Sequence, residues 1–239
     1  MDAQIESILG DAAGQGAITS PAPREALDRE EHLIRDAVLR MGALVEAAIR
    51  EAARALVAHD AALALDVVKG DAIINDAQRG VSRLISVTIA TQQPVARDLR
   101  YLLTLDHVTY ELERIGDHAA SVAKQARKLA PEPPLAEYVH LPRMGELGAE
   151  LVHGILRALV DIDQHQARAV AAGDDEIDDL YHKTFAELID LMREDPDNVE
   201  RGARIMLAAH YLERIGDRVT NIAEDVVFLA SGEIEDLNP

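Results

Sequence analysis

Hydrophobic side chains recur every three or four positions along most of the 239 residues, which places them on one face of successive helices. In the first half this pattern predicts helices over residues 24–58, from 61 to about 92, and from Pro94 to about 129. Proline is favoured in the first turn of a helix and disfavoured inside one, so Pro94 marks a turn. Gly70 predicts a kink in the second helix. The first stripe comprises Ile34, Val38, Met41, Val45, Ala48, Ala52 and Ala55.

The second half repeats this plan after a proline-rich linker, residues 131–141. One helix is expected from Pro142 to about Ile162, a second after Gly173, and a third from the turn at Pro196 to Gly232, a residue suited to a helix C-terminus. Aligning residues 110–130 with 210–230 gives nine identities in 21 positions, so the repeat is about a hundred residues long. It is therefore too long for a solenoid unit.

The pattern predicts an all-α fold of two tandem three-helix bundles related by an internal repeat. The bundles span residues 24–130 and 142–232. Residues 1–23 are expected to form a flexible N-terminal tail, and residues 233–239 a C-terminal tail.

Composition narrows the classes of function. The chain lacks cysteine, which excludes thiolate chemistry and disulfides, and its formal net charge of −19 argues against binding to nucleic acid. No apolar run approaches the roughly 20 residues that span a bilayer, so we expect no membrane insertion and a cytoplasmic protein. We find no Ser-His-Asp arrangement or glycine-rich phosphate loop, and we predict no catalytic residues and no enzymatic activity.

One hexapeptide occurs twice, as Leu-Glu-Arg-Ile-Gly-Asp at residues 112–117 and again at 212–217. On a helix, the Glu and Asp of each copy lie one turn apart and point the same way. Two carboxylates held so close repel each other unless a cation lies between them. Each copy is therefore a candidate cation site.

Neighbouring helices supply each copy with partners. In a helical hairpin, residues equidistant from the turn lie side by side, so reflection through Pro94 places Asp71 and Asn75 opposite Asp117 and Glu113. The same reflection in the second half places Asp174 opposite Asp217 and Asp178 opposite Glu213. The heptad phase puts these clusters on the outer face of the helices, away from the core.

Oxygen ligands of this kind suit iron, zinc, manganese or magnesium. The second cluster is expected to bind better, because Asn221, Glu224 and His182 extend it whereas the first half has Ser121 and Lys124. The candidate metal ligands are Glu213, Asp217, Asp174, Asp178, Glu113, Asp117 and Asp71.

The doubled hexapeptide, the stretch Gln-Pro-Val-Ala-Arg-Asp-Leu-Arg at 93–100 and Asn-Ile-Ala-Glu at 221–224 resemble the PhoU family over roughly residues 24–232. The resemblance implies multinuclear iron or zinc clusters at the acidic motifs. It also implies a negative regulator of phosphate homeostasis that acts between a phosphate ABC transporter, through its ATPase, and a sensor histidine kinase.

Two other functions stay open. A ferritin-like metal oxidase would need a buried di-iron site, and Glu150 and His153 have the Glu-x-x-His spacing without a second copy. A metal-free helical scaffold would leave the acidic side chains solvated. The long apolar stripes also favour a homodimer.

Overall fold

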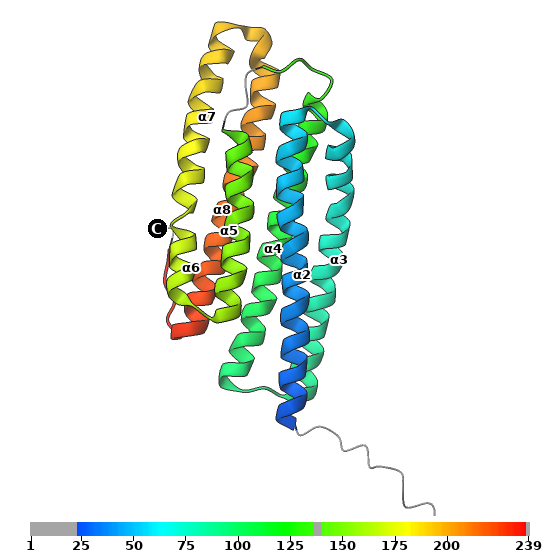
Figure 1. Cartoon of the computed structure of the whole chain (residues 1–239), viewed down its shortest axis with the longest axis vertical. Coiled ribbons are helices and arrows are strands. Elements are labelled where there is room, and N and C mark those ends of the chain that lie inside the picture. The colour runs from blue at the N-terminus through cyan, green and yellow to red at the C-terminus, as the bar shows by residue number, and fades with distance from the viewer. Residues whose placement is uncertain (1–22, 136–139, 238–239) are drawn as a thin grey trace, which may run out of the picture.

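The computed structural model describes residues 23–135 and 140–237 and is helical apart from turns, short connections and the C-terminal segment. The expected tail over residues 1–23 lies outside the described residues except for Pro23, which begins a helix. The first half forms three long antiparallel helices (Figure 1): α2 (Pro23–Ala58), α3 (Ala61–Gln92) and α4 (Ala96–Leu129). The second half contains α5 (Leu141–Asp161), α6 (Gln164–Ala171), α7 (Asp174–Glu194), the 3₁₀ helix η2 (Pro196–Asn198) and α8 (Val199–Ser231).

The predicted all-α fold with an internal repeat is confirmed. α4 and α8 pack against each other in the centre, α3 packs on α4, α7 packs on α8, and α2 packs on α5. Leu112 and Ile115 of the first hexapeptide and Leu212 and Ile215 of the second are fully buried. The buried side chains of both halves form one continuous hydrophobic core.

The short helix α6 was not predicted. It begins after Asp163, whose carboxylate accepts hydrogen bonds from the backbone N–H groups of His165 and Gln166 at 2.8 and 3.1 Å. Asp60 makes the same kind of N-cap at the start of α3, so α6 and α7 together correspond to α3. Neither cap was predicted, although Asp is a favoured N-cap residue.

Gly70, predicted as a kink, and Gly173, predicted to precede a helix, lie in different surroundings. α3 runs unbroken through Gly70, and a Cβ at this position would meet no neighbouring atom; the kink itself stays a prediction. Gly173 separates α6 from α7, and a Cβ built there would lie 2.7 Å from Cδ2 of Leu151 and 3.0 Å from the carbonyl oxygen of Val170. The break therefore forms where α5 leaves no room for a side chain.

The remaining helix ends follow local rules. α4 begins at Ala96 rather than at Pro94, and α8 ends at Gly232, where φ is 80° as the predicted C-terminal glycine requires. No helix within residues 23–135 and 140–237 combines the length and the apolar character needed to cross a bilayer.

Candidate metal centre

The hairpin of α3 and α4 brings Asp71 and Asn75 next to Glu113 and Asp117, as the reflection through Pro94 predicts. Nδ2 of Asn75 donates to Oδ2 of Asp71 at 3.2 Å. Burial and the charge of Asp117 raise the pKa of Asp71, and burial together with Asp117 and Asp71 raises the pKa of Glu113. This first cluster therefore holds three carboxylates that repel one another.

Cationic side chains of the protein surround the first cluster. Arg114 lies 3.6 Å from Glu113 and 3.7 Å from Asp117. Lys124 opposes the rise in the pKa of Asp71, and both Arg114 and Arg79 oppose the rise in the pKa of Glu113. The charge that a metal ion would balance here is already offset in part by the chain itself.

The second cluster is deeper. Asp174, at the start of α7, is only 6% exposed, and burial followed by the charges of Asp178, Asp217 and Glu213 raises its pKa to about 7. The pKa values of Asp178 and Glu213 are also raised, first by burial and then by the charge of Asp217. All four predicted acids of the second half thus lie together.

A glycine of the hexapeptide makes this burial possible. A Cβ built on Gly216 would lie 1.7 Å from Oδ1 of Asp174, so only glycine lets the carboxylate sit against the backbone of α8. At the equivalent Gly116, a Cβ would instead meet the side chain of Ile74 at 3.1 Å. The expectation that both clusters lie wholly on the outer surface is therefore wrong for Asp174, which fills the space that Gly216 leaves.

Histidines replace part of the cationic surroundings of the second cluster. Nδ1 of His210 lies 3.2 Å from Oε2 of Glu213, and His182 opposes the rise in the pKa of Asp178. Arg214 pairs with Asp217. His210 was missed, although its position three residues before Glu213 puts it on the same helix face and was visible in the sequence. A histidine, unlike an arginine, can ligate a metal through a ring nitrogen.

Several oxygens in these clusters are of the type that hard cations prefer as ligands. Asp71, Asn75, Asp174 and Asp178 each carry a buried Oδ1 without a hydrogen-bond partner. Such atoms are costly unless a ligand satisfies them. In the described part of the chain, no three Asp, Glu or His side chains are already arranged around one point, so coordination would require side-chain rotation. The role of the seven acids as metal ligands stays a prediction.

Asn221 and Glu224, expected to extend the second cluster, have other partners. Nδ2 of Asn221 donates to Oε2 of Glu111 across the packing of α4 against α8, at 3.2 Å. Glu224 accepts a hydrogen bond from the backbone N–H of Leu237 at 2.9 Å. Both side chains are committed to contacts that join segments distant in sequence.

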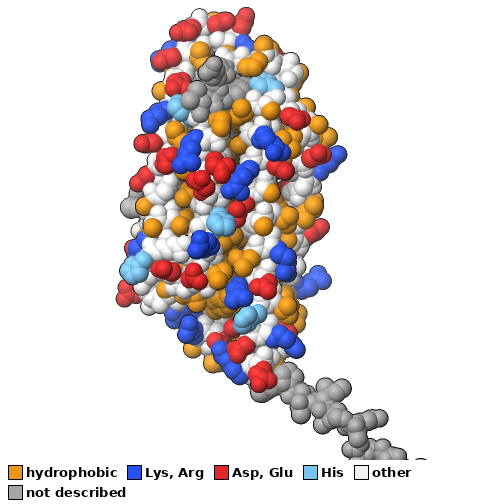
Figure 2. All heavy atoms as spheres, viewed as in Figure 1, with side chains coloured by type: hydrophobic (Ala, Val, Ile, Leu, Met, Phe, Trp, Pro, Cys, Tyr) orange, Lys and Arg blue, Asp and Glu red, His pale blue; other side chains and the backbone are white. Residues whose placement is uncertain are grey.

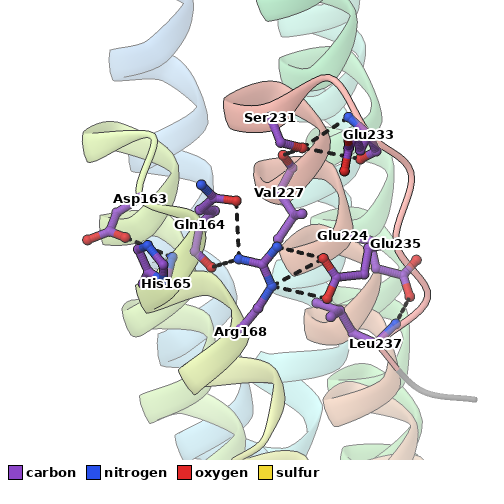
Figure 3. Close-up of polar contacts among 10 residues, drawn as sticks. All are labelled: Asp163, Gln164, His165, Arg168, Glu224, Val227, Ser231, Glu233, Glu235 and Leu237. Carbon is purple, nitrogen blue, oxygen red and sulfur yellow. Dashed lines mark hydrogen bonds and ion pairs between the residues drawn. The ribbon is translucent and has the colours of Figure 1, made fainter.

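The segment after α8 folds back, so that Glu235 and Leu237 reach residues of α6 and α8 (Figure 3). Arg168 of α6 donates to both carboxylate oxygens of Glu235, with Nη2 2.6 Å from Oε2 and Nε 3.1 Å from Oε1. Leu237 lines a cavity of about 200 Å³ together with Asp174 and Asp178. Residues 233–237, expected only as a tail, thus form part of the surroundings of the acidic cluster.

Comparison with known proteins agrees with this repeat. A family model described as the PhoU domain matches residues 38–126 and again residues 141–226. A Clostridium acetobutylicum protein named phosphate-specific transport system accessory protein PhoU homolog is 34% identical over 216 residues, which cover 90% of this chain and 99% of that protein. A Pseudomonas aeruginosa homologue of the same name is 36% identical over 83% of each chain.

Solved structures show the same arrangement of helices. The crystal structure of PhoU from Pseudomonas aeruginosa superimposes with a TM-score of 0.82 at 35% identity, covering 86% of this chain and 99% of that one. The phosphate transport system regulatory protein PhoU from Streptococcus pneumoniae also gives a TM-score of 0.82, at 30% identity and with 88% and 99% coverage.

The buried Asp174 predicts a pH-dependent stability of the metal-free protein. Its folded pKa of about 7 exceeds the unfolded value of 3.8, so the native state binds more protons between these limits and stability falls as pH rises through this window. Asp174→Asn should remove most of this slope and raise the free energy of unfolding above about pH 7 by roughly 1–3 kcal/mol. Urea denaturation in chelator at several pH values measures it.

Asp175→Asn is the matched control, because it removes an exposed charge from the same helical turn. A slope that is unchanged in Asp174→Asn, or that is lost equally in Asp175→Asn, would contradict the assignment to Asp174.

Proposed function

This chain belongs to the PhoU family of phosphate-transport accessory proteins, and from that premise we propose that it is a negative regulator of phosphate uptake and of phosphate-starvation signalling. The observation that carries this proposal is the double match: both halves fit the same domain model, and the relatives align over nearly their whole length. We propose that the protein acts by binding rather than by catalysis.

The proposed partners are the ATPase of a phosphate ABC transporter and a sensor histidine kinase. Both follow from the family resemblance, and a protein that binds both would act in the cytoplasm. A net charge of −19 favours basic surfaces on these partners and long-range attraction to them.

We further propose that the acidic clusters bind iron or zinc. Asp174 and Asp178 of α7 would hold the ion from one side and Glu213 and Asp217 of α8 from the other. A bound cation supplies the positive charge that lets four carboxylates stay ionised at close range. The chain contributes buried carboxylate oxygens that have no hydrogen-bond partner. A metal ion bound to them would link α7 to α8.

The second cluster should be the stronger metal site. Glu213→Gln with Asp217→Asn should weaken Zn²⁺, Fe³⁺ and Mn²⁺ binding by roughly a hundredfold or more, because two of four charged ligands are lost. Isothermal titration of protein purified without chelator measures this, together with the rise in melting temperature on metal addition.

The matched variant is Glu113→Gln with Asp117→Asn in the first cluster, where Arg79, Arg114 and Lys124 already offset the charge. This variant should still bind the first metal ion as tightly as the parent protein does. If both double variants bind metal as the parent does, neither cluster is the site; if only the first-cluster variant loses binding, the ranking of the two clusters is wrong.

The regulatory role predicts a phenotype. Deleting the gene should derepress alkaline phosphatase when phosphate is plentiful, because the sensor kinase would no longer be inhibited. Enzyme assays in the deletion strain measure it, with the parent gene and the Glu213→Gln, Asp217→Asn variant supplied in trans. Normal repression in the deletion strain would refute the proposal, whereas full complementation by the variant would separate regulation from metal binding.

The two alternatives make different claims about the site. For a ferritin-like oxidase, Glu150 and His153 would have to face a common interior site, but Glu150 pairs with Arg143 at 3.4 Å and His153 lies 3.3 Å from Glu46, with the Glu150 and His153 side chains half-exposed or more. A metal-free scaffold remains a distinct outcome of the titration above.

We also propose a homodimer. The face formed by α2 and α5 shows apolar side chains between charged ones (Figure 2), and a groove of about 600 Å³ between these helices is lined by Leu39, Ala43, Leu156 and Val160. Light scattering in solution, with Val160→Glu as the disruptive variant, tests this assignment, because Val160 lines the groove and is 38% exposed.

A further inference from the structure

A cavity at one end of the molecule is lined by more basic than acidic side chains, unlike the acidic clusters. Its volume is about 330 Å³, and it lies where α2 and α4 begin and where α5 and α8 end. Three arginines contribute to the wall: Arg24, Arg35 and Arg97. In a chain with a net charge of −19, three guanidinium groups around one hollow are unexpected from composition alone.

Two of these arginines have N–H donors that are not paired with an acceptor. Arg24 is committed, since it pairs with Asp28 at 2.9 Å and with Asp98 at 2.5 Å. Arg35 uses Nη2 for a 3.4 Å contact with Asp36, but its Nε is buried without a partner. Arg97 makes no hydrogen bond or ion pair with any other described residue.

One acceptor in the same wall is also unsatisfied. Oε1 of Glu31 is buried without a hydrogen-bond partner, one helical turn from Arg35 on α2. The side chains of Glu31 and Arg35 line the cavity, although these two atoms have almost no accessible surface. Unpaired buried donors and acceptors are rare in native structures unless a ligand or water completes them. The cavity wall therefore holds a guanidinium and a carboxylate that each keep an atom without a partner.

The start of α4 adds to the positive character. Its N-cap residue, Val95, supplies no side-chain hydrogen bond to the first turn, which contains Arg97 and Asp98. The N–H of Asp98 donates to the carbonyl oxygen of Val95 at 3.2 Å, and the positive end of the helix dipole favours an anion near this position. Asp98 offsets part of this charge but is engaged by Arg24.

We propose that this cavity binds inorganic phosphate as hydrogenphosphate. Guanidinium groups bind the oxygens of a tetrahedral anion in a bidentate manner, which Arg97 and Arg35 can supply. The remaining P–OH group donates to the carboxylate of Glu31, a role that sulfate cannot fill because it carries no proton near neutral pH. The acceptor thus selects phosphate over sulfate, and over phosphate monoesters, whose second pKa of about 6 leaves them without a proton at about pH 8.

This site is separate from the acidic clusters. Asp98 and Asp117 lie on one helix, and at 1.5 Å per residue they are about 28 Å apart along its axis. The proposal does not depend on metal binding or on the regulatory role, because it concerns the purified chain alone.

The experiment is isothermal titration of the whole purified protein at about pH 8 with phosphate, sulfate and glycerol 3-phosphate. The parent should bind phosphate at millimolar concentration or below and at least about tenfold more tightly than the other two anions. Arg97→Gln and Arg35→Gln should each weaken phosphate binding roughly tenfold to a hundredfold. Arg83→Gln, an exposed arginine of α3 outside the cavity, should change nothing.

Glu31→Gln is the decisive variant, because an amide can donate to any of these anions. It should bind phosphate and sulfate about equally, and it should fold, because Glu31 is only partly buried and its Oε1 has no hydrogen-bond partner to lose. The proposal is overturned if the parent shows no phosphate binding at millimolar concentration, if it binds the three anions equally, or if it prefers glycerol 3-phosphate. Retained selectivity in Glu31→Gln would overturn it as well.

Discussion

The packing of α4 against α8 is the contact on which the other features depend. It is the largest contact between helices from different halves, and it buries the apolar residues of both hexapeptides completely. Each such side chain contributes roughly 1.5–3 kcal/mol when removed from water, so these two helices cannot rotate without a large loss of stability. With their orientation set, the Glu and Asp of each hexapeptide must point toward the neighbouring helix of their own hairpin.

Polar contacts across the same packing set the register of the two halves. His107 lies 2.6 Å from Asp225, and Glu111 accepts hydrogen bonds from Asn221 and Arg218 at 3.2 and 3.5 Å. A group such as Glu111, only 7% exposed, is costly to bury unless it is paired, which penalises any shift of one half along the other. The two acidic clusters therefore sit at defined places on a rigid body rather than on independent domains.

The two halves of the chain have similar helix arrangements but differ in the side chains around their acidic clusters. Where the first half has Tyr110, Arg79 and Lys124, the second has His210, His182 and Glu224 at the corresponding positions. Cationic side chains of the protein thus offset part of the charge of the first cluster. The second cluster keeps its carboxylates close together next to the C-terminal segment. Gly216 deepens the difference, since it admits the carboxylate of Asp174 where Gly116 admits an isoleucine. A cavity lined by three arginines lies at the far end of the molecule, so the cation and phosphate sites that we propose would be separate.

Local rules explain what could be predicted from the sequence. These rules are hydrophobic periodicity, proline turns and helix capping, and each acts over a few neighbouring residues. They predicted the long helices and the repeat. Reflection through each turn then predicted which seven acids lie together in the two clusters. Three features depended on contacts between distant segments. Asp174 is buried because α8 has no side chain at Gly216; Glu224 is occupied because Leu237 returns to it; and the arginine cavity forms because four helix ends meet there. Which residues share a helix face follows from their spacing along the chain. Which of those faces meets a gap, a partner or solvent depends on the packed helices, because steric space between helices is a property of the assembled core.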